Sequence, residues 1–283
     1  MTIQVEQVTG PVAYHGEGPV WSERWGGLRW VDMLAGDILS FAEDGSVERR
    51  HVGRVAAAVR PRARGGAVIG VERGFALEEP DGTVTHLDPL WAGDEVRMNE
   101  GGCDPDGRFY CGSMAEDRQP GAASLYRLDP DGSTHVVLEG VTISNGLEWS
   151  PDGSLAYYND TATEQVSVFD YDPERGLTGH RTFVRIDDEG RPDGLTVDAE
   201  GGVWVAVSNR SAVHRYSPDG SLDEVIPVPA TKVTACTFGG AALDELFITT
   251  SQENIEPGSD PLAGSLFRAE VGVRGRPVRE FAG

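Results

Sequence analysis

Cysteine is scarce in this sequence: there are three, Cys103, Cys111 and Cys236, and none belongs to a C-x-x-C pair. An odd, scattered set argues against a disulfide framework and a structural zinc site, so we expect buried, unreactive thiols. The first ten residues, MTIQVEQVTG, lack the basic start and apolar core of a secretory signal. No apolar run approaches the roughly 20 residues that span a bilayer. These absences predict a cytoplasmic location and no membrane partner.

Basic side chains are also few. The chain of 283 residues has 24 Lys and Arg against 46 Asp and Glu, a formal charge of −22 at pH 7. Such a surface repels phosphate backbones and anionic lipid heads, so no nucleic-acid partner is expected. Hydrophobic residues make up 39% of the chain, which is ordinary for a globular protein. No linker or low-complexity stretch divides it, and no obligate protein partner is evident.

Glycine and proline, by contrast, are plentiful, with 37 and 17 residues. Asp-Gly pairs between apolar runs are strong hairpin signals, because glycine readily adopts the positive φ that a tight turn needs. One series of turns precedes compact apolar strands, at Gly27, Gly66, Gly107, Gly153, Gly201 and near Leu243. A second series lies in more polar hairpins, at Gly45, Gly82, Gly132, Gly176 and Gly220.

The two series share a period of about 40–48 residues. Two hairpins per period imply four strands per unit, and six units fill residues 1–283. The sequence therefore predicts an all-β fold, a six-bladed β-propeller formed as one domain, with four antiparallel strands per blade. We expect the N-terminal strand, Ile3–Tyr14, to close the last blade as its outer strand, and a final hairpin at Val273–Arg276. A β-sandwich would explain the number of strands but not the repeat length.

The inner strands of a propeller begin around the central channel, so residues there converge from all blades. The first series of turns sets the register of the inner strands. The residues eight positions before each of these turns, or ten positions before the first of them, should lie at the same depth and form one ring around the channel. This ring contains Glu17, Ala58, Asn99, Asn145, Asp193 and Ala235. Its two carboxylates would repel each other without a cation, and an all-oxygen set favours Ca²⁺, Mg²⁺ or Mn²⁺ over Zn²⁺ or Cu²⁺. Asn-Gly and Asp-Gly pairs are also ordinary turn chemistry, but their shared register favours ligands.

Five separated motifs extend this pattern: GEGPVW at 16–21, RMNEGGCDPDGRFYCGSMAED at 97–117, ISNGLEWSPDG at 143–153, RPDGLTVDAEGGVWVA at 191–206 and TACTFGG at 234–240. With them the sequence resembles the gluconolactonase/regucalcin family, also called senescence marker protein, which includes luciferin-regenerating enzyme. The resemblance implies a six-bladed propeller and a metal-dependent lactonase whose partner is a small-molecule sugar lactone.

The resemblance also implies roles for individual residues. The implied ligands of one divalent cation are Glu17, Asn145 and Asp193. The ion expected first is Ca²⁺, with Mg²⁺, Mn²⁺ or Zn²⁺ as alternatives. Arg97 and Asn99 resemble the family's substrate-contacting pair. Asp117 aligns with a glutamate that also touches substrate in the animal members and is one methylene shorter.

A lactonase must stabilise the oxyanion that develops at the carbonyl, and a dication can do so. Asp193 is the candidate general base, and Arg97 can hold hydroxyls or the product carboxylate. A surface ion pair of Arg97 with Asp94 or Glu95 is the alternative. His15 is the histidine placed to line the mouth, and no G-x-S-x-G motif supports a serine hydrolase.

The leading functional interpretation is hydrolysis of a lactone such as gluconolactone to the aldonic acid. Two alternatives stay open. One is a hydrolase of the same fold that acts on organophosphates or other esters. The other is a non-catalytic calcium-binding propeller.

Overall fold

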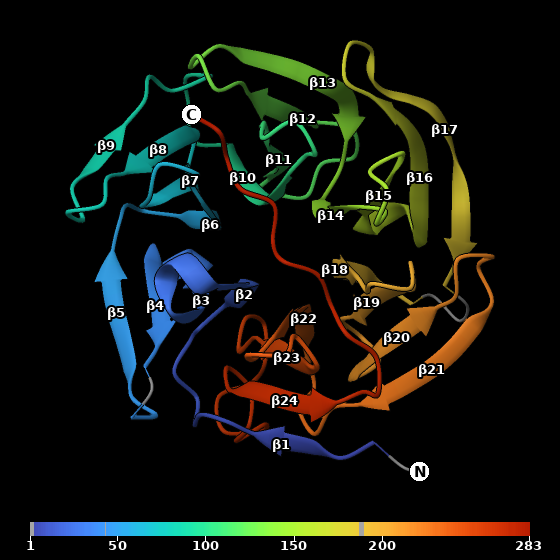
Figure 1. The fold of residues 1–283 in the computed structure, drawn as a ribbon. Coiled ribbons are helices and arrows are strands. Elements are labelled where there is room, and N and C mark those ends of the chain that lie inside the picture. The colour runs from blue at the N-terminus through green and yellow to red at the C-terminus, as the bar shows by residue number, and fades with distance from the viewer. Residues whose placement is uncertain (1–2, 43, 187–189) are drawn as a thin grey trace.

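The computed structural model describes residues 3–42, 44–186 and 190–283. These residues form six four-stranded antiparallel sheets arranged radially around a channel (Figure 1). The six-bladed propeller predicted from the repeat length is therefore confirmed. No helix in the described part of the chain is long and apolar enough to cross a membrane.

Blades 1 to 5 follow the chain, each from its inner to its outer strand. Blade 1 contains β2 (Gly16–Ser22), β3 (Gly27–Asp32), β4 (Asp37–Phe41) and β5 (Val47–His51). Blade 2 contains β6 (Ala56–Pro61), β7 (Ala67–Val71), β8 (Gly74–Glu78) and β9 (Val84–His86). Blade 3 contains β10 (Val96–Cys103), β11 (Phe109–Ala115), β12 (Ala123–Leu128) and β13 (Thr134–Val141).

Blade 4 contains β14 (Ser144–Trp149), β15 (Leu155–Asp160), β16 (Gln165–Asp172) and β17 (Gly176–Arg185). Blade 5 contains β18 (Pro192–Val197), β19 (Val203–Val207), β20 (Ala212–Tyr216) and β21 (Leu222–Pro227). Blade 6 combines β22 (Val233–Gly239), β23 (Glu245–Thr250) and β24 (Leu266–Glu270) with β1 (Val5–Gln7). Short 3₁₀ turns are η1 (Glu23–Trp25), η2 (Met33–Ala35) and η3 (Thr161–Thr163).

The ring closes as the sequence predicts, because β1 pairs with β24 as the outer strand of blade 6, with Val5 opposite Ala269. The strand is shorter than the predicted segment. The hairpin expected at Val273–Arg276 is wrong, since residues 271–283 contain no strand. The physical reason is that β1 already occupies the outer edge of blade 6 and leaves no partner for a further hairpin.

Residues 271–283 run across the end of the channel where the inner strands finish (Figure 1). We call them the C-terminal segment. Its hydrogen bonds join Arg274 to Ala199, Gly275 to Leu243, Arg279 to Ser150, Phe281 to Pro61 and Ala282 to Gly107. The segment thus connects blades 2 to 6 and covers one end of the channel.

A register shift interrupts each inner strand near its start. The shifts lie between Glu17 and Val20, Ala56 and Ala58, Met98 and Gly101, Ser144 and Leu147, Pro192 and Leu195, and Val233 and Ala235. A bulge of this kind bends its strand and re-aims a side chain. Asn99, Asn145 and Asp193 are the first residues inside three of the shifts, so the bulges present them to the channel.

Two glycines beside these residues allow the inner strands to approach closely. A Cβ on Gly146 would lie 2.5 Å from a backbone nitrogen of β18, and a Cβ on Gly194 would lie 2.4 Å from the Cβ of Ala235. The Asn145–Gly146 and Asp193–Gly194 pairs therefore belong to strands β14 and β18, and not to turns.

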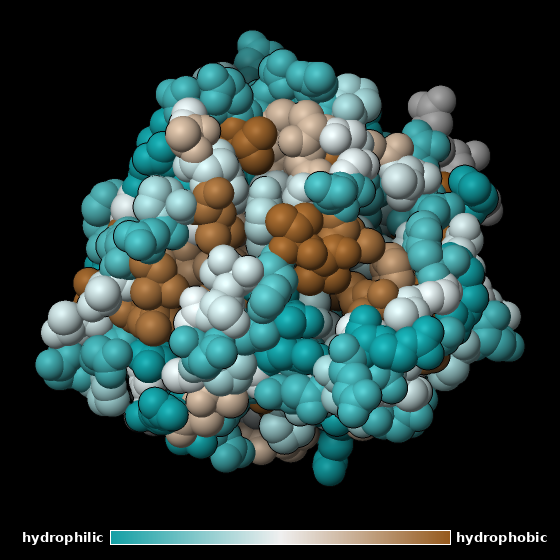
Figure 2. Space-filling model, turned by 90° about the horizontal axis from the view of Figure 1, so that it is seen from above, coloured by the Kyte–Doolittle hydropathy of each residue, from teal (hydrophilic) through white to brown (hydrophobic). Residues whose placement is uncertain are grey.

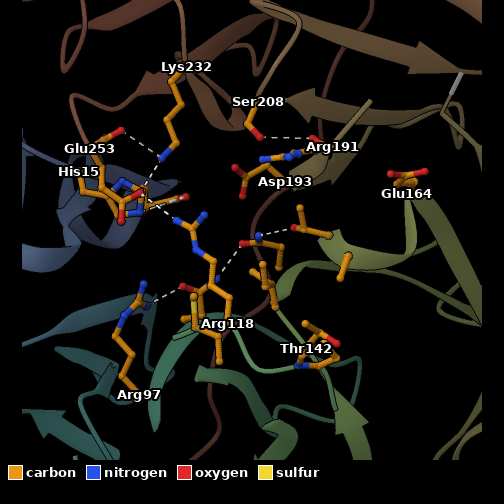
Figure 3. Close-up of a pocket in the computed structure, with 18 residues that line it drawn as sticks. His15, Arg97, Arg118, Thr142, Glu164, Arg191, Asp193, Ser208, Lys232 and Glu253 are labelled. Atoms are coloured by element: carbon orange, nitrogen blue, oxygen red, sulfur yellow. Dashed lines mark hydrogen bonds and ion pairs between the residues drawn. The ribbon is translucent and has the colours of Figure 1, made fainter. Parts of the chain in front are cut away.

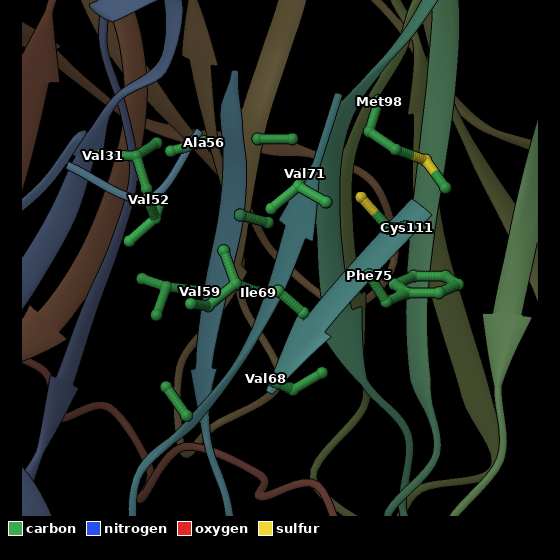
Figure 4. Packing of buried hydrophobic residues seen from close by; sticks show 14 of the residues in the cluster. Val31, Val52, Ala56, Val59, Val68, Ile69, Val71, Phe75, Met98 and Cys111 are labelled. Atoms are coloured by element: carbon green, nitrogen blue, oxygen red, sulfur yellow. The ribbon is translucent and has the colours of Figure 1, made fainter. Parts of the chain in front are cut away.

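The hydrophobic core fills the spaces between blades. Ile69 and Phe75 of blade 2 pack with Met98 and Cys111 of blade 3 (Figure 4). All three cysteines are buried and free, and burial raises the pKa of the Cys111 thiol to about 12. Hydrophilic residues dominate the outer face in Figure 2, where apolar residues form separate patches.

Candidate active site

A cavity of about 410 Å³ opens where the inner strands begin, at the end of the channel away from the C-terminal segment (Figure 3). Charged and polar side chains of blades 1, 3, 4, 5 and 6 line it. Met114 of blade 3 and Ile143 before β14 add an apolar wall. The cavity therefore offers both charged groups and an apolar surface to one small ligand.

The deepest part of the cavity brings the predicted polar ring residues together. Glu17, Asn99, Asn145 and Asp193 all line it and are 2%, 4%, 5% and 7% exposed. They come from blades 1, 3, 4 and 5, which lie far apart in the sequence and meet only at the channel. Burial of four oxygen-bearing side chains in one place is costly unless a ligand or partner satisfies them.

A chain of hydrogen bonds fixes the two asparagine side chains. Arg97 Nη1 donates to Asn99 Oδ1 (2.6 Å), and Asn99 Nδ2 donates to Asn145 Oδ1 (3.0 Å). Asn145 Nδ2 donates to Thr161 Oγ1 (2.7 Å), and that hydroxyl donates to Pro192 O (2.7 Å). Because Asn99 Oδ1 already accepts a hydrogen bond from the positively charged Arg97 guanidinium, a metal cation is repelled from this oxygen. The Asn145 oxygen keeps a second lone pair and is the better ligand.

Burial raises the pKa of three carboxylates in the channel, and repulsion between carboxylates adds to the effect at two of them. Burial raises the pKa of Glu17 and of Asp193 well above the usual range. Repulsion between Glu17 and Asp193, and from the nearby Glu100, adds to the effect. Burial also raises the pKa of Glu100 to about 7, although the Arg60 guanidinium acts in the opposite direction. A dication would offset this concentration of negative charge.

The donor set defines which ions fit. Within the described ranges, no group of three or more His, Cys, Asp or Glu side chains is arranged to hold a metal. A site here therefore depends on the Asn145 amide oxygen together with the Glu17 and Asp193 carboxylates. Glu17 Oε2 accepts a hydrogen bond from the amide of Gly18 (3.2 Å), which orients it. Two carboxylates and an amide oxygen are hard donors that suit Ca²⁺, Mg²⁺ or Mn²⁺.

Arg97 is buried at the side of the cavity, with 4% of its surface exposed. Its carboxylate partner is Glu116, with Oε2 3.5 Å from Arg97 Nε, and not Asp94 or Glu95. Burial lowers the pKa of the guanidinium, while the carboxylates of Glu116 and Glu253 act in the opposite direction. Arg97 is therefore placed to meet a ligand, and the surface ion pair is not the arrangement found.

Asp117 lies outside this arrangement. It is exposed after β11, and its Oδ1 accepts a hydrogen bond from the amide of Gln119 (3.1 Å). The neighbouring residues point to the site instead, since Glu116 pairs with Arg97 and Arg118 lines the cavity. The structure thus does not bring Asp117 to the residues expected to contact substrate.

Five charged residues that line the cavity were not among the predicted site residues: Arg118, Glu164, Arg191, Lys232 and Glu253. Lys232 Nζ lies 2.6 Å from Glu253 Oε2, and Arg118 Nη2 lies 3.9 Å from the same oxygen. Arg191 and Lys232 immediately precede β18 and β22, so a count along the inner strands misses them. One signal was available for Lys232, because it is the only lysine of the chain.

His15 lines the cavity, as expected from its position beside Glu17. Its Nδ1 lies 2.7 Å from Ser251 Oγ, and its Nε2 lies 3.9 Å from Glu17 Oε1. Burial lowers the pKa of His15 to about 3. The ring is therefore neutral at neutral pH and adds no positive charge to the site.

A family model described as SMP-30/Gluconolactonase/LRE-like region matches residues 15–252. The chain belongs to the SMP-30/gluconolactonase family. Its relatives in this family include regucalcin of Danio rerio, 34% identical over 293 residues that cover 100% of this chain and 99% of that protein. A Bacillus subtilis protein named "Putative sugar lactone lactonase YvrE" is 34% identical over 277 residues, 95% of each chain.

Solved structures agree with the architecture of this SMP-30/gluconolactonase chain. The calcium-binding protein regucalcin of Agrobacterium tumefaciens superposes with a TM-score of 0.93 at 24% identity, over 100% of this chain and 99% of that one. A gluconolactonase of Xanthomonas campestris superposes with a TM-score of 0.78 at 24% identity, over 95% and 89% of the two chains. At this identity both show the fold alone.

Proposed function

We propose that the protein is a divalent-metal-dependent lactonase that hydrolyses a sugar lactone to the aldonic acid. The observation that carries the proposal is the meeting of Glu17, Asn145 and Asp193 at the bottom of a cavity large enough for a small ligand. The names of family members, gluconolactonase and sugar lactone lactonase, supply the substrate class.

These three residues would hold the cation. Calcium fits first, because it accepts mixed carboxylate and amide oxygens in flexible geometry, and Mg²⁺ or Mn²⁺ fit the same hard donors. Zn²⁺ is a weaker candidate without a His or Cys ligand. When bound, a dication supplies Lewis-acid stabilisation of the oxyanion at the lactone carbonyl, worth several kcal/mol.

The remaining chemistry falls to side chains of the chain. One Asp193 oxygen can accept the proton of the attacking water, in keeping with the raised proton affinity of this carboxylate. Arg97 holds a sugar hydroxyl or the product carboxylate through its planar donor fork. Asn99 Nδ2 is committed to Ser144 O (2.7 Å) and Asn145 Oδ1, so Asn99 orients the ligand set as well as facing the substrate.

Proton release from D-glucono-1,5-lactone, with and without EDTA, tests the proposal. We expect turnover above the spontaneous rate that EDTA abolishes and Ca²⁺, Mg²⁺ or Mn²⁺ restores. Glu17→Gln and Asp193→Asn should lose both cation binding and turnover. Glu174→Gln, which removes an exposed carboxylate from a turn, is the matched control.

The same experiment separates the alternatives. A cation that raises the melting temperature while no lactone of a broad panel is hydrolysed would establish a non-catalytic calcium-binding propeller. Turnover of a phosphotriester but of no lactone would establish the organophosphate hydrolase. Either result overturns the lactonase proposal.

A further inference from the structure

The cavity is rich in cations although the chain is strongly acidic. Arg97, Arg118, Arg191 and Lys232 all line it, four of only 24 basic residues in a chain with a formal charge of −22. Four carboxylates, Glu17, Glu164, Asp193 and Glu253, line the same cavity. The charges of the side chains that line the cavity therefore balance, whereas the chain as a whole is strongly negative, and a bound dication would add positive charge to this lining.

The pairing of these charges leaves positive charge at the mouth. Lys232 and Arg118 share one carboxylate, that of Glu253, at 2.6 and 3.9 Å. The Lys232 ammonium also acts on the deeper carboxylates, because its charge lowers the pKa of both Glu17 and Asp193. Lys232 is therefore close enough to the proposed cation ligands to act on their charge, and Figure 3 shows its side chain in the pocket beside Glu253.

Counted among the described residues, Arg191 has the fewest charge partners of the four cations. Its guanidinium makes no hydrogen bond or ion pair within the described residues, and the side chain is exposed at the cavity. Its backbone, by contrast, is held: the amide donates to Asn209 Oδ1 (2.8 Å), and Ser208 N donates to the Arg191 carbonyl (3.0 Å). The backbone of Arg191 is thus held in place, and no described residue pairs with its guanidinium.

A neutral sugar lactone offers no anionic group to Lys232 and Arg191. Its carbonyl goes to the proposed dication, and its hydroxyls need hydrogen bonds but not full charges. Charge-assisted bonds to a carboxylate or phosphate are shorter and stronger than bonds to a hydroxyl. The apolar wall of Met114 and Ile143 can meanwhile cover the C–H face of the ring.

We propose that the preferred substrate is a lactone with a second, anionic group, a carboxylate or a phosphate, which Lys232 and Arg191 bind. The inference rests on the proposed lactonase function and narrows its substrate class.

Matched substrate pairs test it. One pair is D-galactono-1,4-lactone and D-galactaro-1,4-lactone, which differ by a carboxylate. The other is D-glucono-1,5-lactone and its 6-phosphate. We expect a higher kcat/KM for the anionic member, and the pair with the larger ratio identifies the anionic group. Equal kcat/KM values within both pairs would overturn the inference but leave the lactonase proposal standing, whereas no turnover of any lactone would refute that proposal.

Substitutions test whether Arg191 is responsible for the expected preference for anionic lactones. Arg191→Gln should lower kcat/KM for the anionic lactone about tenfold more than for its neutral partner, the scale of one charge-assisted hydrogen bond. Arg175→Gln removes the same charge from an exposed turn and should leave the ratio unchanged. If Arg191→Gln lowers both members equally, the guanidinium only balances charge, and the inference fails.

A binding measurement that needs no turnover uses the single lysine. Reductive ¹³C-methylation labels Lys232 and the N-terminal amine, so the Lys232 resonance is identified as the one that Lys232→Arg removes. With the metal-loaded protein, 6-phosphogluconate or galactarate should shift this resonance at lower concentration than gluconate or galactonate. Equal midpoints for the four acids would contradict a site for a second anion.

Discussion

Three buried carboxylates in one channel make the metal-free protein sensitive to pH. Glu17, Glu100 and Asp193 have a higher pKa in the folded protein than in an unfolded chain. At these three groups the folded state therefore binds more protons, so their contribution to stability is greatest below the ordinary carboxylate pKa and is lost as the pH rises through the folded pKa. A bound dication compensates the same charges, so adding Ca²⁺ should reduce the loss.

Glu100 gives the size of the effect. Its pKa rises from 4.5 to about 7, and each tenfold change in proton affinity is worth about 1.4 kcal/mol. Ionised Glu100 therefore costs the folded state roughly 3 kcal/mol. The cost is absent well below pH 4.5 and complete above pH 7. For a chain of this length it corresponds to about 5 °C in melting temperature.

The assay is thermal unfolding of metal-free wild type and Glu100→Gln from pH 5 to 8. The melting temperature of Glu100→Gln relative to wild type should rise by several degrees over this range, because the variant does not ionise. Asp117→Asn removes an exposed carboxylate and should show no such trend. A difference that stays constant or shrinks with pH would refute the cost assigned to burying the ionised Glu100 carboxylate in the channel.

Three further substitutions probe the support of the site. Thr161→Val removes the acceptor of Asn145 Nδ2 (2.7 Å) and should weaken cation binding about 10–100-fold in calorimetric titration; unchanged affinity would show that Asn145 needs no such support. Gly146→Ala places a Cβ 2.5 Å from a backbone nitrogen and should cost about 1–3 kcal/mol in urea unfolding. Phe281→Ala empties a core position that is 1% exposed and should cost about 3–5 kcal/mol; a loss below 1 kcal/mol would mean that the C-terminal segment adds little.

Most of the fold could be predicted because the turns are local and repeat. An Asp-Gly turn needs no information from distant residues, and a constant period of two hairpins defines a four-stranded blade. The hairpin predicted at Val273–Arg276 is wrong because its formation depends on residues that are distant in the sequence. Whether a hairpin forms there depends on the free edge of blade 6, and that edge is taken by β1 from the other end of the chain. No local pattern reports on that competition.

In the candidate site, too, the positions set by the repeat could be predicted and those set by loop geometry could not. The repeat fixes how far along the channel each residue lies, so Glu17, Asn145 and Asp193 could be grouped before the structure was known. Lys232 reaches the cavity from outside the inner strand, where loop geometry sets its direction. The family resemblance implied a substrate contact for Asp117, but its carboxylate accepts a hydrogen bond from the Gln119 amide in its own turn. Side-chain direction in loops is therefore the part that spacing does not provide.

The glycines that follow two of the proposed ligands, Asn145 and Asp193, explain why residue spacing alone could predict these positions. Inner strands that converge on an axis crowd their backbones, and a Cβ at Gly146 or Gly194 would collide with the next blade. The residue before each glycine sits at the bulge and projects into the channel. The same bulge thus lets two blades pack closely and turns a polar side chain into the channel. Asn-Gly and Asp-Gly therefore recur in the sequence because the packing of the blades requires the glycine. It follows that replacing either glycine should impair cation binding as well as stability, even though neither contacts the ion.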